Sequence, residues 1–177
     1  MKKISERFKS LWAKKSRDSG LLWMPLATHM SDSAAIAKKI WNRWLSDGVK
    51  QIIEEGIPGA ADGEKLFIFL AAVHDLGKAT PVFQAKKSYP SFYDLDNMIL
   101  QNIQASGLPI KPSYSFSDSR KTPHALASQL LLEKCGFDKS IAIVIGSHHG
   151  KPPSNNTLNQ CGVEVYGENF HLGKPGK

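Results

Sequence analysis

The sequence contains little cysteine and no long uninterrupted apolar run. Cys135 and Cys161 are its two cysteines among 177 residues, and neither belongs to a CxxC pair. This pattern argues against a thiolate zinc site and against a fold that depends on disulfides. No stretch approaches the ~18 apolar residues that a membrane span requires, and the basic N-terminus lacks the apolar segment of a secretory signal. We therefore expect a soluble cytoplasmic protein without a membrane partner.

Strand-like alternation of apolar and polar residues is almost absent, whereas helical spacing recurs along the chain. A hydrophobic content of 41% with 22% charged residues is typical of a globular domain and excludes a disordered chain. We therefore predict an all-α fold. The net charge of +7 would favour a polyanionic partner such as nucleic acid. The lysines are scattered, however, and a charge of this size alone more often serves solubility.

Helical patterns predict six helices. Trp41 and Trp44 in the first lie at helical spacing with Ile36 and Ile40, so we expect both tryptophans to pack in the core. The second helix is apolar on all sides, which predicts the central buried helix of the domain, ended by Gly77. Cys135 closes an apolar helical stretch and should be a small core residue. The predicted ranges are 25–47, 62–74, 81–87, 94–106, 122–136 and 138–149.

Two helix starts carry clear capping signals. Thr122 precedes Pro123, which is typical of a hydroxyl cap followed by a proline in the first turn, and Asp138 can cap the last helix. Beyond that helix the composition turns to Asn, Gly and Pro, with at most one short strand in GVEVYG. We therefore divide the chain into a helical domain, residues 1–153, and a tail, residues 154–177.

Six histidines occur, and five of them lie on or beside the apolar face of a predicted helix. One buried histidine is usually a hydrogen-bonded core residue, but five would leave many polar atoms unsatisfied, at about 1–3 kcal/mol each. A shared metal cluster would satisfy all of them. The adjacent His74 and Asp75 supply an imidazole nitrogen and a carboxylate, and a carboxylate can bridge two metals ~3.5–4 Å apart. The five are His29, His74, His124, His148 and His149.

The ordered pattern H…HDxGK…H…HH on four successive helices resembles the HD superfamily of metal-dependent phosphohydrolases. Within it, the chain resembles the N-terminal HD nuclease domain of the CRISPR-associated helicase-nuclease of type I systems. The matching stretches lie within residues 23–153, and they are WMPLATHMSDSAAIAKKIWNRWL, FLAAVHDLGKATPVFQAKK, TPHALASQLLLEKCG and IVIGSHHGKPP.

The resemblance implies a compact helical HD-domain fold with a two-metal centre among the central helices. By it, Asp75 and Lys78 would be catalytic, with Lys78 facing the substrate phosphate, and Thr80 and Gln84 would line the substrate site. It also implies cleavage of single-stranded DNA in antiviral CRISPR interference, beside a superfamily-2-type helicase part, fused or separate, and the CRISPR RNA-guided surveillance complex. One metal would be held by His29, His74 and Asp75, and the second by Asp75, His124, His148 and His149.

Histidine-rich ligation favours manganese, iron, cobalt or nickel over magnesium alone. The metals would lower the pKa of a bridging water and stabilise charge on the phosphoryl oxygens, with Lys78 assisting. No protein nucleophile is needed, and none is evident in the sequence.

The chain departs from the family pattern at two points. It contains no P-loop of the form GxxxxGK[ST], and it lacks the metal-binding aspartate that the family places after the HH pair, beside a tryptophan. Only Glu164 and Glu168 follow the pair as acidic residues, and His171 is a further tail histidine. This second departure favours an alternative, a non-catalytic docking module with a structural metal. A cyclic-dinucleotide HD phosphodiesterase, whose HH pair continues with glutamate, and a simpler HD nucleotidase, which lacks that pair, match less well.

Overall fold

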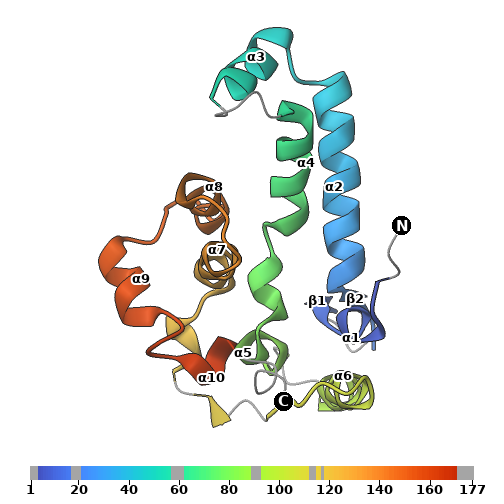
Figure 1. Cartoon of the computed structure of the whole chain (residues 1–177). Helices are drawn as coiled ribbons and strands as arrows, with labels where there is room; N and C mark the ends of the chain where they lie inside the picture. Colours follow the sequence, from blue (N-terminus) through green and yellow to red (C-terminus); the bar gives the residue numbers. More distant parts are fainter. Residues whose placement is uncertain are drawn as a thin grey trace.

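The computed structural model describes residues 4–16, 21–56, 62–88, 93–111, 115–116 and 118–170. It is mostly helical, as predicted, and the long helices α2 (Leu26–Arg43) and α4 (Gly63–Val73) lie side by side (Figure 1). Helix α7 (His124–Lys134) packs against the 3-10 turn η1 (Leu76–Ala79) that follows α4. The junction of α4 and η1 therefore lies between α2 and α7, and it is here that the candidate site forms.

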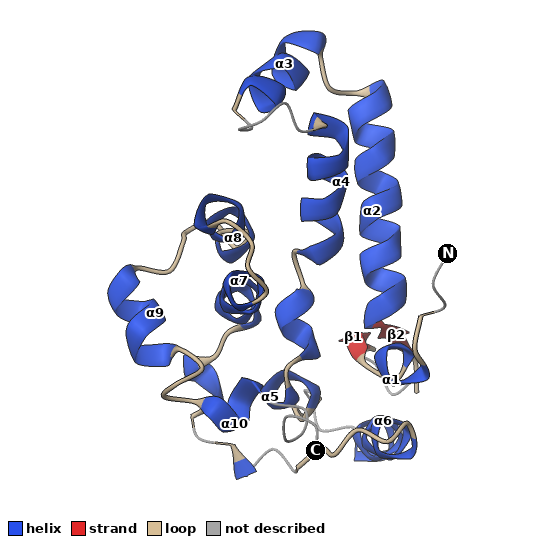
Figure 2. Ribbon diagram, viewed as in Figure 1, coloured by secondary structure: helices blue, strands red, loops and turns tan. Residues whose placement is uncertain are grey.

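A small antiparallel sheet lies at the N-terminal end of α2 (Figure 2). It joins β1 (Trp12–Lys15) to β2 (Trp23–Pro25), with Trp12 opposite Pro25 and Lys15 opposite Trp23. The sequence pattern had not indicated these strands, because three or four residues are too short to display an alternation. The sheet matters for the site because β1 also lies against η1.

The first predicted helix is two helices in the structure. Helix α2 ends at Arg43, and a separate helix α3 (Asp47–Glu55) begins after Ser46, whose side-chain oxygen accepts a hydrogen bond from Val49 N. The predicted end of the first helix, at residue 47, was therefore wrong, because α2 ends earlier and Gly48 lies inside α3. A serine cap outweighs the helix-weakening effect of one glycine in the first turn.

Three apolar clusters hold the helices together. One joins β1, α2, α5 (Pro81–Gln84) and α6 (Tyr93–Ala105), with Leu26, Leu95 and Ile99 fully buried. A second joins α4, α7 and α8 (Lys139–Gly146). The third packs α7 against the helices of the predicted tail, and its buried residues include Cys161 and Phe170. The remaining short elements are α1 (Glu6–Lys9), η3 (Ser119–Lys121), α9 (Asn155–Cys161) and α10 (Gly167–Phe170).

The last two helices lie in the segment that the sequence placed in a tail. Residues 162–166, expected to contain at most one strand, form a turn between α9 and α10. Asn169 is buried, and its side-chain amide donates to Thr122 Oγ1 at 2.9 Å. Thr122 is thus engaged with α10 and does not cap α7, whose N-cap residue is Pro123 with no side-chain cap bond. Asp138 does cap α8, as predicted.

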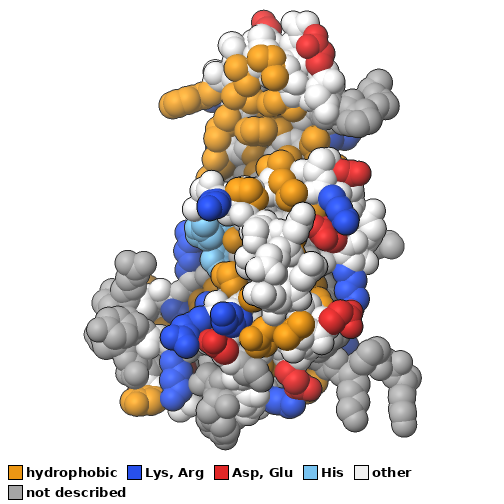
Figure 3. Space-filling model, turned by 90° about the vertical axis from the view of Figure 1, so that its left-hand side faces the viewer, with side chains coloured by type: hydrophobic (Ala, Val, Ile, Leu, Met, Phe, Trp, Pro, Cys, Tyr) orange, Lys and Arg blue, Asp and Glu red, His pale blue; other side chains and the backbone are white. Residues whose placement is uncertain are grey.

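The apolar surface is larger than the helix patterns suggested. Trp41 is buried as predicted, but Trp44 is 85% exposed and Cys135 is also exposed, so both of those core assignments were wrong. Among the residues of α4 only Gly63 is buried, so this helix, which packs against α2, α3 and α8, is half-buried and not the fully buried helix that was predicted. Hydrophobic side chains accordingly cover the upper part of the face in Figure 3. None of the described helices is both long and apolar enough to span a membrane.

Candidate metal centre

The His74-Asp75 pair occupies the turn between α4 and η1, held from behind by α7. His74 is the C-cap of α4, and Asp75 is the N-cap of η1. Ser128 Oγ of α7 accepts a hydrogen bond from Gly77 N at 2.7 Å and donates one to His74 O at 3.0 Å. A Cβ at Gly77 would lie only 2.0 Å from His124 O, so the close approach of η1 to α7 requires glycine there.

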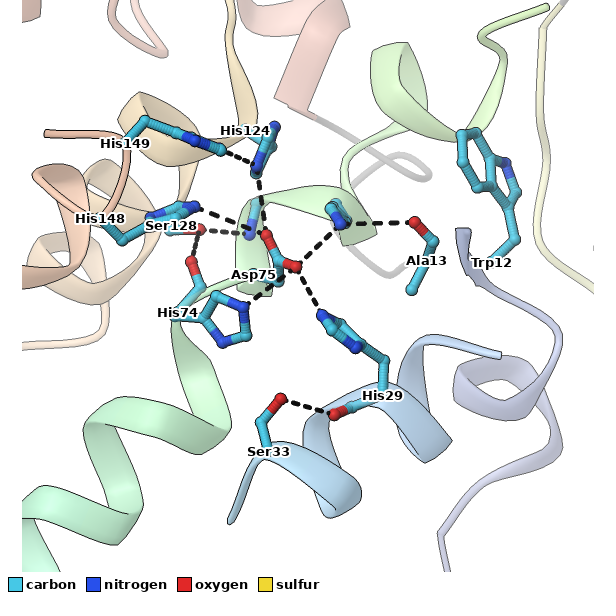
Figure 4. Close-up of polar contacts among 12 residues, drawn as sticks. Trp12, Ala13, His29, Ser33, His74, Asp75, His124, Ser128, His148 and His149 are labelled. Carbon is cyan, nitrogen blue, oxygen red and sulfur yellow. Dashed lines mark hydrogen bonds and ion pairs between the residues drawn. The ribbon is translucent and has the colours of Figure 1, made fainter. Parts of the chain in front are cut away.

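The Asp75 carboxylate lies at the centre of the histidines, and only 4% of the residue is exposed (Figure 4). Its Oδ2 atom lies 2.7 Å from His29 Nε2 and 3.2 Å from His74 Nε2. Its Oδ1 atom lies 3.2 Å from His124 Nε2 and 3.6 Å from His148 Nε2. The two carboxylate oxygens therefore face two different sets of imidazoles.

The potential metal-ligating atoms of the described residues are divided in the same way between the two sides of Asp75. Two groups emerge, and within each group the ligand atoms lie within 4.8 Å of one another. In the second group, the Nε2 atoms of two imidazoles, one from α7 and one from the turn after α8, approach to 2.8 Å. The first group is His29, His74 and Asp75; the second is His124, His148 and His149.

Backbone carbonyls orient two of the imidazoles. His74 Nδ1 lies 2.8 Å from Ala71 O, and His148 Nδ1 lies 2.7 Å from Ile145 O. A carbonyl only accepts, so each Nδ1 carries a proton, and each ring thereby turns its Nε2 towards Asp75. His148 follows the end of α8 at Gly146, in the turn and not inside the predicted helix.

The electrostatics of the cluster favour an ionised Asp75 and shift the pKa values of the histidines in opposite directions. Burial by itself raises the pKa of the Asp75 carboxyl, but hydrogen bonds from neighbouring imidazoles and the Lys78 ammonium outweigh burial and hold that pKa well below its usual range. Burial lowers the pKa of His29 and of His148. The hydrogen bond to Asp75 raises the pKa of His74. At neutral pH the centre thus offers a carboxylate beside at least two neutral imidazoles.

One buried atom tests whether these residues suit a metal ion. His148 Nε2 is buried and has no hydrogen-bond partner among the described residues, although it faces Asp75. A buried polar nitrogen without a partner costs about 1–3 kcal/mol, and a metal at this position would offset that cost. A donor set of imidazole nitrogens around one carboxylate suits borderline transition metals. The residues present therefore fit a divalent metal.

Lys78 lies on η1 beside the carboxylate. Its ammonium is 2.8 Å from Asp75 Oδ2 and donates a hydrogen bond to Ala13 O of β1 at 3.3 Å. Its side chain is 12% exposed. Lys78 is thus placed where a phosphate bound at the centre would meet a positive charge.

Thr80 and Gln84, which the resemblance placed along the substrate site, are buried behind it. Thr80 Oγ1 donates to Gly77 O, and Gln84 Nε2 donates to Trp12 O and to Lys78 O. Gln84 Oε1 in turn accepts from Trp12 N. The geometry gives both side chains a structural part, because Gln84 ties β1 to η1 and contacts the Lys78 backbone, whereas Thr80 bonds back to η1 itself.

Ser128 was not among the candidate site residues. Its signal was available, because it lies one helical turn after His124 on the same face of α7. What the spacing could not reveal was its partner, the backbone of the His-Asp turn more than 50 residues earlier in the chain.

Replacing Ser128 by alanine should destabilise the domain by about 1–3 kcal/mol, because it leaves the Gly77 N–H and the His74 carbonyl buried without this partner. Urea unfolding followed by circular dichroism measures the change. Ser31→Ala, on an exposed position of α2, should change the unfolding free energy by less than about 0.5 kcal/mol. Equal stability of the two variants would contradict the bridging role of Ser128.

The acidic residues that follow the HH pair do not supply the missing carboxylate. Glu164 and Glu168 are exposed, and Glu168 forms an ion pair with Lys111 at 2.7 Å. Across the part of the chain that the structure describes, Asp75 contributes the carboxylate of these two groups, and neither group includes a glutamate. His171 lies outside the described residues.

A helical scaffold that presents an adjacent His-Asp pair, a following lysine and three further histidines around one carboxylate defines the HD class of candidate metal centres. The model of the family described as "Cas3, HD domain" matches residues 12–169. The chain belongs to this family.

Similar proteins agree with this assignment. The chain is 42% identical over 157 residues to a CRISPR-associated nuclease/helicase Cas3 of Streptococcus thermophilus, covering 86% of this chain and 17% of that protein. It is 29% identical over 160 residues to a CRISPR-associated endonuclease/helicase Cas3 of Thermus thermophilus, covering 84% of this chain and 15% of that protein. A solved structure described as a CRISPR-associated protein superposes with a TM-score of 0.72 at 25% identity, over 96% of this chain and 20% of that one. The chain thus spans no more than about a fifth of the length of these proteins.

Proposed function

We propose that this chain is a metal-dependent nuclease domain that hydrolyses phosphodiester bonds of single-stranded DNA in type I CRISPR interference, an antiviral defence in the cytoplasm. The observation that carries the proposal is the Asp75 carboxylate, whose two oxygens face two separate sets of imidazoles. A carboxylate shared in this way is suited to two-metal phosphoryl chemistry.

Two divalent transition metals, manganese, iron, cobalt or nickel, would fit the donor set. When bound, they would supply Lewis-acid chemistry, lowering the pKa of a water and stabilising negative charge on phosphoryl oxygens. Asp75 would belong to both sites. The first site would add His29 and His74, and the second would add His124, His148 and His149.

The side chains of the chain itself would bind and orient the phosphate. Lys78 is held by Ala13 O and Asp75 at a defined position beside the centre, so its ammonium would contact a phosphoryl oxygen. His149 is exposed, and histidine side chains reach the surface of the face in Figure 3, with Lys and Arg side chains beside and below them. An open, basic approach of this kind suits a single nucleic-acid strand, whose binding should weaken as salt increases.

The partners we propose follow from the relatives. Those proteins are described as combined nucleases and helicases, and this chain covers 17% and 15% of their lengths. A superfamily-2-type helicase, fused or separate, would supply the single strand, and an RNA-guided surveillance complex would direct both to the target.

The test is cleavage of circular single-stranded DNA by the pure chain in Mn²⁺, Co²⁺ or Ni²⁺. We expect nicking with at least one metal, and a loss of at least about tenfold in His148→Ala, which removes an oriented ligand. The neighbouring Ser147→Ala variant should cleave like the unmodified chain. Gel electrophoresis after fixed times reads both rates.

A docking module with a structural metal is the second candidate, because Asp75 is the one carboxylate in the two described groups. It predicts metal binding and cooperative folding without cleavage in any of the three metals. That combination would contradict the nuclease proposal and support the module.

A further inference from the structure

The ring of Phe83 lies beside the candidate metal centre, and the ammonium groups of two lysines lie near this ring. Lys78 Nζ lies 5.6 Å from the ring centroid and Lys86 Nζ lies 5.0 Å from it. The same ring meets His124 edge-on, with the ring centroids 5.6 Å apart. Lys86 is therefore a second lysine at the edge of the centre, and the histidine pattern of the sequence did not point to it.

Lys86 has no carboxylate partner among the described residues. Burial lowers its pKa, the charge of Lys78 lowers it further, and no acidic group counteracts either effect. Lys15 on β1 shows how a buried ammonium is usually stabilised, since it pairs with the Asp96 carboxylate at 2.7 Å. The ammonium of Lys86 is half-buried near the charge of Lys78, and no acidic group of the described residues offsets the cost of removing it from water. An anionic ligand would supply that compensation.

The position of Lys86 is fixed by its surroundings. Its backbone N–H donates to Phe83 O at 3.0 Å, and its carbonyl accepts from Lys15 Nζ at 2.7 Å. Phe83 is buried and packs against the Trp12 ring, with centroids 4.6 Å apart. The ammonium of Lys86 thus stands on a rigid aromatic platform, so less conformational entropy is lost on binding than for an exposed lysine.

We propose that Lys86 and the Phe83 ring form a phosphate subsite for the nucleotide next to the cleaved bond. Lys78, which is paired with Asp75, serves the phosphate that reacts, and Lys86 holds the adjacent phosphodiester of the same single strand. The inference rests on the proposed function and adds to it a residue that binds substrate away from the reacting atoms. It does not require metal, because the contact is between an ammonium and a phosphate.

The experiment compares Lys86→Ala with Lys87→Ala, the adjacent and exposed lysine. Fluorescence anisotropy measures binding of a labelled oligothymidylate, about 15 nucleotides long to span one strand-binding site, to the whole chain in EDTA over a series of salt concentrations. We expect Lys86→Ala to weaken binding about tenfold and to reduce the salt slope by roughly 0.7, the value for one lost phosphate contact on a single strand. Lys87→Ala should change affinity less than about twofold, and Lys86→Arg should restore binding.

Equal binding of the Lys86→Ala and Lys87→Ala chains, or an unchanged salt slope, would overturn the subsite. Lys86→Gln, which keeps part of the stem over Phe83, replaces the alanine variant if thermal unfolding shows that alanine disturbs the fold. Cleavage by the unmodified chain in Mn²⁺ is measured separately. If the unmodified chain cleaves DNA but the two lysine variants bind it equally, only the subsite is rejected. If the unmodified chain does not cleave DNA but Lys86→Ala selectively loses binding, only the nuclease proposal is rejected.

Discussion

The Asp75→Asn variant is expected to lose divalent-metal binding and DNA cleavage together. The substitution keeps the size of the side chain but removes the one charge that faces both sets of imidazoles. Changes to residues that merely orient metal ligands already cost about 10–100-fold in affinity or activity. We therefore expect Mn²⁺ affinity, measured by isothermal titration calorimetry, to fall at least about 100-fold, and cleavage of circular single-stranded DNA to fall by at least as much.

Asp32→Asn is the matched control, because Asp32 is exposed on α2 and makes the same change of charge away from the centre. It should bind Mn²⁺ as the unmodified chain does. Circular dichroism confirms that both variants are folded. If the Asp75→Asn chain bound Mn²⁺ with unchanged affinity, the two groups of ligands around Asp75 would not be a metal centre.

The second large effect is expected on stability. A methyl group at Gly77 would meet His124 O at 2.0 Å, Ser128 N at 2.6 Å and Ala127 Cβ at 2.9 Å. Two of these atoms belong to the backbone of α7, so rotation of a side chain cannot relieve the overlap. We expect Gly77→Ala to destabilise the domain by about 3 kcal/mol or more. That loss corresponds to a drop in Tm of roughly 10 °C for a chain of this size.

Gly48→Ala tests whether the effect comes from packing. Gly48 is in the first turn of α3, and apart from its chain neighbours and its own helix backbone no atom of the described residues lies within 4 Å of a Cβ there. Alanine should therefore leave stability unchanged or raise it by up to about 1 kcal/mol. Thermal unfolding of both variants decides the matter, and a Gly77→Ala chain that melts with the unmodified protein would show that η1 and α7 do not approach as closely as described.

Local sequence signals predicted the helices well and their surroundings less well. The predicted Asp138 cap is present, because a cap is a contact over two or three residues. Trp44 has the spacing of a core residue but is 85% exposed, since helical periodicity shows which residues share a face and not what covers that face. Thr122 has the sequence of a cap, yet its hydroxyl accepts from Asn169, 47 residues later.

The candidate ligands could be predicted from residue types and from a family pattern, whereas the residues that hold the site in place could not. The HD pair, the later histidine and the HH pair can be identified directly in the sequence. Gln84 and Ser128 act through backbone partners 72 and 51 residues away, which no local spacing encodes. For the same reason Gln84 was expected to line the substrate site, whereas its side chain is buried behind that site.

The sequence by itself determined that this chain is helical, that it belongs with HD-type proteins, and that five histidines and Asp75 are the candidate centre. Residue types, caps and a family pattern suffice for those conclusions because each can be recognised along the chain without knowing how its helices pack. Only the tertiary structure decided that the two oxygens of Asp75 face different imidazoles, and that Lys86 stands beside Lys78 over Phe83 without a carboxylate partner among the described residues. Those facts depend on how α2, η1 and α7 pack, and packing joins residues that the sequence keeps far apart.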